Sequence, residues 1–353
     1  MLLAYVIIIL SLILSHMFIG RFMKNYDRNV SRKKKFWLDV FRECTDKGTY
    51  VLNKRQIHKL NNATMLAAFG VAYKEALKHH SDIKRLLYDN VAFIAAFGSQ
   101  LRSKTKRACF AYMLVGFELH EAGKYPAFDD LILGYLLDDS VFVRENALLA
   151  LYSFGNEKSV AKALLLLSKK GVFHSEKLLS DGLLTFTGDR ERLAEELMSV
   201  FARLNECYRI GVINFMRYTG NHQHDAQLIA LLESGVTSKE ITCCIIRLLA
   251  KFHSAQNGEA ILKVLENNFD SEDWEPAAVA ASSLVSYQHE HVVTTLIKAM
   301  TSKAWYVRIN SAKSLAAMKV SDRAIREIAA SNDRYAVEAF ESERSKGGEE
   351  VFV

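Results

Sequence analysis

The stretch LLDDSVFVRENALLALYSFG, from Leu136 to Gly155, decides the fold expected of this chain. It contains an acidic turn in which Asp139 or Ser140 is placed to cap the helix that follows. Apolar or small residues then recur every three or four positions, which is the period of one helix face, and Gly155 is typical of a helix C-terminus. Such a unit buries one stripe and needs neighbours, so its recurrence would indicate a solenoid.

The pattern does recur along the chain. Arg144 stands near the start of the helix in this unit, with small or apolar residues three, four and seven positions later. Six other positions begin a similar pattern, which after Lys177 holds only at plus three and plus seven. Successive copies lie 31 to 37 residues apart: Arg107, Lys177, Arg209, Ile241, Ala277 and Arg308. Lys, Ile or Ala replaces the arginine in three of them. Further amphipathic segments lie between the copies: Val160–Leu167, Leu193–Phe201, Gln227–Leu232, Ala260–Leu265, Val292–Met300 and Arg323–Ala330. A chain of 353 residues with only two prolines fits such a nearly all-helical array.

The runs DDSVFVRENALLAL and WYVRINSAKSL resemble HEAT repeats, particularly the bacterial phycobilin-lyase-type HEAT family, over residues 103–345. The resemblance implies antiparallel helix pairs stacked into a right-handed superhelix, with the second helix of each pair, which carries the Val-Arg motif here, lining a concave face. It also implies scaffolding or recognition as the commonest role. The fold class expected is all-α: a HEAT-like α-solenoid with an N-terminal transmembrane helix.

The first 20 residues predict that membrane anchor. Leu2 to Gly20 form an almost unbroken apolar run, which is long enough to span a hydrocarbon core and lacks the basic start and cleavage site of a signal peptide. All nearby basic residues follow the run. The positive-inside rule therefore predicts a single-pass protein with Met1 outside and the remainder in the cytoplasm.

The basic charge of the chain is concentrated directly after this run. Seven basic residues stand against Asp27 alone, so the segment carries the whole net charge of +6: Arg21, Lys24, Arg28, Arg32, Lys33, Lys34 and Lys35. The neutral remainder argues against a general nucleic-acid-binding field. The segment is interpreted either as a helix lying on anionic lipid headgroups or as a topology signal without further role.

The expected domain organisation follows from these segments. It comprises an anchor over residues 1–20, a basic juxtamembrane helix or linker over 21–51, N-terminal capping helices over 52–102, HEAT-like repeats over 103–345 and a tail over 346–353.

The sequence predicts neither an enzyme nor a cofactor site. No phosphate-binding loop, dinucleotide fingerprint or nucleophile elbow is present. Two histidine pairs, His222 with His224 and His289 with His291, invite a metal site, but residues two apart do not share a helix face. We therefore expect no metal ligands, and a tethered metal enzyme that uses these histidines remains the alternative.

The leading hypothesis is a scaffold that binds a membrane-associated protein, such as a bacterial glycosyltransferase or a signalling protein. The candidate partner-binding residues lie off the apolar stripe of the helices that carry the motif: Glu145, Asn146, Tyr152, Asn214, Arg217, Asn310 and Lys313. A lipid-binding or nucleic-acid-binding role for Arg21–Lys35 is a further alternative, of which the nucleic-acid version is disfavoured.

Overall fold

A computed structural model describes residues 2–117, 126–318, 320–330 and 334–349 of the chain, without the side chains of residues 2–20, 22, 23 and 346–349. Within these ranges the protein is built from helices and contains no strand. Contacts divide it into two compact units. Unit 1 comprises Met1–Lys170 and Thr185–Glu196, and unit 2 comprises Gly171–Leu184 and Leu197–Val353. The predicted repeat array over 103–345 therefore extends through both units.

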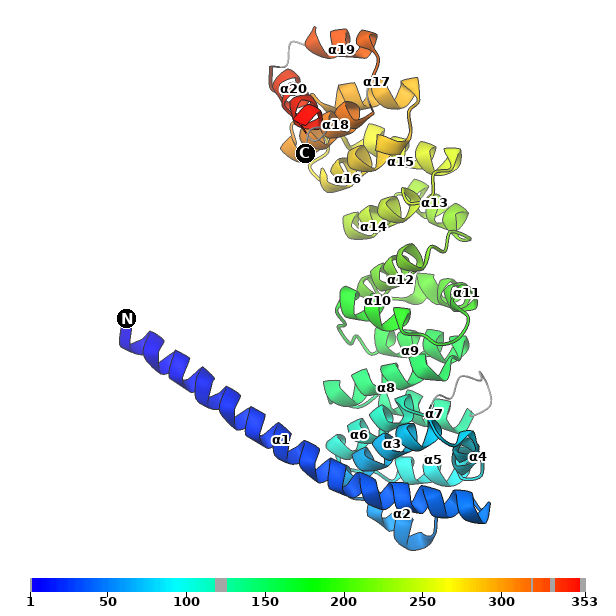
Figure 1. Cartoon of the computed structure of the whole chain (residues 1–353). Coiled ribbons are helices and arrows are strands. Elements are labelled where there is room, and N and C mark those ends of the chain that lie inside the picture. Colours follow the sequence, from blue (N-terminus) through cyan, green and yellow to red (C-terminus); the bar gives the residue numbers. More distant parts are fainter. Residues whose placement is uncertain (1, 118–125, 319, 331–333, 350–353) are drawn as a thin grey trace. The chain divides into compact units, whose positions relative to one another are not determined.

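Unit 1 is made of two layers of helices (Figure 1). Each helix of the first layer packs on the next, in the order α1, α3, α6 and α8, while α5, α7 and α9 form the second layer. The helix bounds in this unit are α1 Leu2–Lys47, α2 Lys54–Leu60, α3 Ala63–Leu77, η1 Ser81–Lys84, α4 Arg85–Tyr88, α5 Val91–Ser99, α6 Lys104–Val115, α7 Pro126–Tyr135, α8 Val141–Phe154 and α9 Glu157–Lys169.

Unit 2 repeats the two-layer arrangement. Its first layer runs through α10, α12, α14, α16, α18 and α20, and its second layer contains α13, α15, α17 and α19. The bounds are α10 Glu176–Leu184, α11 Arg190–Val200 (which begins in unit 1), η2 Phe201–Arg203, α12 Glu206–Thr219, α13 Asp225–Glu233, α14 Lys239–Leu249, α15 Ala255–Asn268, α16 Glu275–Ser283, η3 Leu284–Ser286, α17 Glu290–Ala299, α18 Trp305–Ala317, α19 Asp322–Ala329 and α20 Arg334–Glu349. Each unit is thus solenoid-like, with helices stacked in two layers.

The repeat predicted from the sequence corresponds to these helix pairs. Arg144 and its equivalents fall on first-layer helices, and the segments predicted between them coincide with α9, α11, α13, α15, α17 and α19. Gly155 ends α8 in the left-handed conformation, at φ 69°, as its position predicts. Ser140 occupies the N-cap position of α8 without a side-chain cap hydrogen bond.

Helix α1 is continuous from Leu2 to Lys47, so the boundary predicted at residue 20 is no break in the backbone (Figure 1). Its C-terminal half is part of the folded unit and not a linker. Trp37 and Phe41 are buried against α3, and Trp37 Nε1 donates a hydrogen bond to the carbonyl of Met65 at 3.0 Å. Aromatic side chains one turn apart hold this half of α1, which charge alone did not predict.

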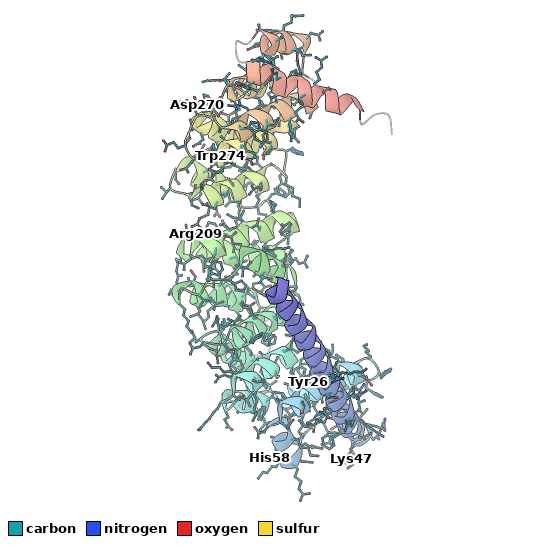
Figure 2. The ribbon with its side chains drawn as sticks, turned by 90° about the vertical axis from the view of Figure 1, so that its left-hand side faces the viewer. Tyr26, Lys47, His58, Arg209, Asp270 and Trp274 are labelled. Atoms are coloured by element: carbon teal, nitrogen blue, oxygen red, sulfur yellow. The ribbon has the colours of Figure 1, made fainter. Side chains whose placement is uncertain are left out.

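The predicted membrane anchor lies outside the described side chains. Among the residues that are described, no helix combines the length and the apolar character needed to cross a bilayer. Tyr26 lies about halfway along α1 and Lys47 at its C-terminal end (Figure 2).

Candidate binding groove between α1, α3, α6 and α8

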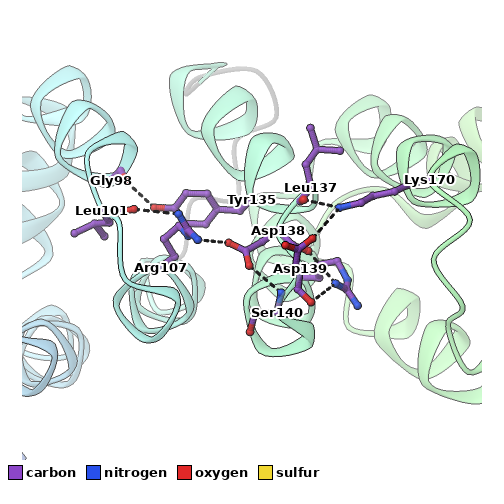
Figure 3. A network of polar contacts seen from close by, with 10 residues as sticks. Gly98, Leu101, Arg107, Tyr135, Leu137, Asp138, Asp139, Ser140 and Lys170 are labelled. Carbon is purple, nitrogen blue, oxygen red and sulfur yellow. Dashed lines mark hydrogen bonds and ion pairs between the residues drawn. The ribbon is translucent and has the colours of Figure 1, made fainter.

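The acidic turn before α8 fixes the position of this helix against α6 (Figure 3). Asp138 forms an ion pair with Arg107 of α6, with 2.5 Å between Arg107 Nη2 and Asp138 Oδ2. The Asp138 side chain is only 6% exposed. Its other carboxylate oxygen accepts a hydrogen bond from the backbone N–H of Ser140 at 2.8 Å. Arg144 Nη1 donates to the carbonyls of Asp138 and Asp139 at 2.8 and 2.9 Å. Both carboxylate oxygens and the carbonyls of the turn are therefore satisfied.

The repeated arginine has the same structural role in other pairs. Arg308 Nη1 donates to the carbonyls of Ser302 and Lys303, and Arg209 bonds the carbonyls of Phe201 and Ala202. These carbonyls lie at or just after the end of the preceding helical segment, where the last carbonyls of a helix lack their regular partners. In these three pairs the arginine of the motif therefore closes the turn before its helix.

A groove of about 570 Å³ lies between α1, α3, α6 and the start of α8. Val30 of α1, Val71 of α3 and Met113 of α6 are among the side chains that make it mainly apolar. Tyr112 of α6 and Phe142 of α8 stand at this groove and are 61% and 77% exposed. Large aromatic side chains left uncovered beside an apolar groove are typical of a binding surface.

Few charges line the groove. Lys74 and Lys104 contribute two positive charges and Asp27 one negative charge. Burial raises the pKa of the Tyr26 phenol and of the Cys109 thiol, both of which line the groove, so both groups are neutral near pH 7. The groove is consequently mainly apolar, and the lysines that line it, Lys74 and Lys104, are exposed.

The sequence-predicted partner residues have different environments. Asn146 lines the groove, but it is half-buried, and its Nδ2 donates to the carbonyl of Ala108 on α6 at 3.2 Å. Asn310 of α18 donates in the same way to Ala278 of α16 at 2.8 Å. Tyr152 is 2% exposed, so the prediction that it faces a partner is wrong. Helix α8 has neighbours in both layers, which cover more of its surface than one stripe.

The other predicted partner residues do not gather at one site. Glu145 is half-buried on α8 of unit 1, whereas Asn214, Arg217 and Lys313 belong to unit 2. Arg217 is half-buried, and its Nη2 donates to the Tyr218 hydroxyl at 3.0 Å. Of these four side chains, only that of Lys313 is exposed. Their roles in binding therefore stay predictions.

The seven predicted membrane-surface residues divide into two groups. Lys33 donates to the Asn62 side chain at 3.0 Å, and Lys34 forms an ion pair with Glu75 of α3 at 2.8 Å. These two lysines therefore belong to the contact between α1 and the helices beside it. The remaining five are exposed: Arg21, Lys24, Arg28, Arg32 and Lys35.

The histidine pairs form no metal-binding cluster among the described side chains. No group of three or more His, Cys, Asp or Glu residues is placed there to hold a metal ion. His291 Nε2 lies 2.9 Å from Glu266 Oε1, and His222 packs its ring on that of Phe252 with 4.7 Å between centroids. His291 and His222 thus each contact a different residue of the protein.

Sequence reasoning missed the aromatic residues of the groove. Tyr26, Tyr112 and Phe142 lie on α1, α6 and α8, and the packing of α1 on α3, of α3 on α6 and of α6 on α8 brings them to one groove. The one local signal was Phe142, an aromatic residue outside the apolar stripe of α8. Trp305 of α18 is another exposed aromatic residue: it is 58% exposed and makes an edge contact with Tyr306.

No family model matches this chain, and no curated protein matches it. Among solved structures it is similar to a crystal structure described as an engineered protein of a structural genomics consortium. The two are 14% identical, the match covers 90% of this chain and 93% of that chain, and the TM-score is 0.39. Similarity at this level carries no argument about function. What is shown is an all-helical, solenoid-like protein with an apolar groove in unit 1.

Proposed function

We propose that this protein is a membrane-anchored, HEAT-like scaffold that binds an apolar helical segment of a partner protein in the groove. One observation carries the proposal: Tyr112 and Phe142 stand largely exposed beside an apolar groove of about 570 Å³. An amphipathic helix that lays its apolar face into such a groove would cover both aromatic side chains. Acidic residues beside that face would meet Lys74 and Lys104.

The proposed anchor is the apolar run Leu2–Gly20, with the N-terminus outside and the remainder of the chain cytoplasmic. Because α1 is continuous, the anchor and one wall of the groove belong to the same helix. At 1.5 Å per residue, Tyr26 lies about 9 Å and Val30 about 15 Å beyond Gly20 along the axis. The α1 wall of the groove would therefore lie close to the membrane surface.

This placement supports a membrane-associated partner. When both proteins are held in the same membrane, their local concentration is high. A groove with only modest affinity is then enough for binding. A membrane enzyme such as a glycosyltransferase, or a membrane-bound signalling protein, would fit. That choice rests on architecture alone.

Co-purification from the native host tests the proposal. The intact chain, solubilised in detergent, is compared with the double variant Tyr112→Asp/Phe142→Asp and with Phe173→Asp, which alters an 83% exposed side chain of unit 2. We expect one stoichiometric partner with the parent chain and with Phe173→Asp, and at least a tenfold loss with the double variant. An unchanged yield with the double variant would reject the groove as the binding site.

A further inference from the structure

We propose that one face of α1 binds anionic phospholipid headgroups and so fixes the rotation of this helix relative to the bilayer. The basic stripe consists of Arg21, Lys24, Arg28, Arg32 and Lys35, all of which are exposed. The inference rests on the proposed anchor and extends it. It states which way the groove faces.

The helical period brings the five cations onto one face. At about 100° per residue they fall within an arc of about 80°. Trp37 and Phe41, which are buried against α3, project from roughly the opposite side of α1. One face of the helix thus packs against the rest of the unit, and the opposite face carries the positively charged side chains.

The partners of these side chains separate the stripe from its sequence neighbours. Lys33 and Lys34 turn toward α3 and the residue before it, where they bond Asn62 and Glu75. None of the five stripe residues has an ion-pair partner among the described side chains. The stripe ends at Asp39, which lies on the same face and pairs with Arg42 at 3.6 Å.

The length of the stripe determines how it can reach a membrane. Lys35 lies about 21 Å beyond Arg21 along the axis, so an upright helix would hold Lys35 well outside a Debye length of about 8 Å. Membrane helices tilt by about 20° on average and by up to about 40°. A tilt toward the stripe lowers Arg28, Arg32 and Lys35 to the headgroups without a break in the helix. The opposite face, with the groove beside it, then points away from the bilayer.

An anionic membrane is the occupant that the chain favours. The stripe begins at the end of the apolar run Leu2–Gly20 and shares its unbroken helix. The basic stripe would therefore lie next to the lipid headgroups. Phosphatidylglycerol and phosphatidylserine carry the negative charge that complements it.

Lysine labelling of the full chain in lipid nanodiscs tests the stripe. Discs of phosphatidylcholine alone are compared with discs in which about one third of the lipid is phosphatidylglycerol. A water-soluble acetylating reagent is applied, and mass spectrometry measures modification of Lys24 and Lys35 against the exposed lysines Lys54 and Lys78. We expect labelling of Lys24 and Lys35 to fall about fivefold in the anionic discs, and this protection to disappear in high salt.

A matched pair of variants makes the result specific. Arg28→Gln/Arg32→Gln should abolish the protection, whereas Arg55→Gln/Arg102→Gln, which removes two exposed arginines elsewhere, should leave it intact. Equal labelling in the two kinds of disc would overturn the proposal while leaving the anchor standing. A chain that enters neither kind of disc would overturn the anchor, and the stripe proposal with it.

Discussion

Asn310 of α18 donates a hydrogen bond from Nδ2 to the backbone carbonyl oxygen of Ala278 on α16, at 2.8 Å. Asn146 of α8 makes the equivalent bond to Ala108 of α6. Both asparagines stand two residues after the arginine of the Val-Arg motif, in the sequences VREN and VRIN. The motif therefore contains an arginine that closes the preceding turn and an asparagine that ties its helix to the preceding first-layer helix.

Replacing this asparagine should lower stability. We expect Asn310→Ala to reduce the free energy of unfolding by about 1 kcal/mol, because the carbonyl of the buried Ala278 loses this side-chain donor. Lys313→Ala, on the exposed face of the same helix, should change it by less than about 0.5 kcal/mol. Urea denaturation in mild detergent, followed by circular dichroism, measures both. Equal effects of the two changes would contradict the interhelix role of Asn310.

The ion pair between Arg107 and Asp138 should contribute more to the free energy of unfolding than the Asn310 hydrogen bond does. Asp138→Ala leaves the Arg107 guanidinium, whose side chain is 24% exposed, without its counter-charge, and we expect a loss of about 3 kcal/mol. Asp130→Ala is the matched control, because Asp130 is 77% exposed and its lysine partner lies 3.9 Å away. That control should stay within about 0.5 kcal/mol of the parent. A small effect of Asp138→Ala would show that the turn is held by the backbone bonds alone.

The close approach of α10 and α12 should be sensitive to a single methyl group. A Cβ at Gly211 would lie 2.5 Å from Leu179 Cδ2, so Gly211→Ala should destabilise unit 2 by about 1–3 kcal/mol. At Gly134, a Cβ would meet nothing within 4 Å. Gly134→Ala should therefore stabilise α7 by about 0.5 kcal/mol. Thermal unfolding of both variants measures the difference, and a shift of the same sign in both would be the contrary result.

Asp129 should make stability depend on pH. Burial raises the pKa of this carboxyl above its ordinary value of 3.8, against the opposing hydrogen bonds from Ser159 and Asn156. The folded state therefore favours the protonated form, and its contribution to stability is lost as pH rises through the folded pKa. Asp129→Asn lacks this loss, so its stability relative to the parent should increase from pH 4 to pH 7. The exposed control Asp130→Asn should show no such trend.

The sequence was sufficient for the helix pairs because their signal is local. The spacing of Val143, Ala147 and Leu151, with Gly155 as the end, describes one helix regardless of its neighbours. Tyr152 shows the limit of this reasoning. A single stripe describes contact with one neighbour, whereas α8 packs on α6, α7 and α9, which leaves fewer positions exposed than the stripe predicts.

The groove could not be predicted for a different reason. Tyr26 and Phe142 are separated by more than 100 residues and meet the same groove because α1 packs on α3 through Trp37 and Phe41. The basic segment also contains residues of two kinds, those that pack against the unit and those that are exposed, because neighbouring residues of a helix point in different directions. Lys34 pairs with Glu75, while Lys35 is exposed. Charge counting cannot separate them.

Photo-crosslinking in living cells shows whether a partner protein binds in the groove. A photoreactive amino acid replaces Phe142 at the groove in one strain and Phe173 in another, both of which are largely exposed. We expect one discrete crosslinked partner protein from position 142, which disappears when Tyr112→Asp is added, and none of that mass from position 173. The same crosslink from both positions, or its persistence with Tyr112→Asp, would contradict a partner bound in this groove.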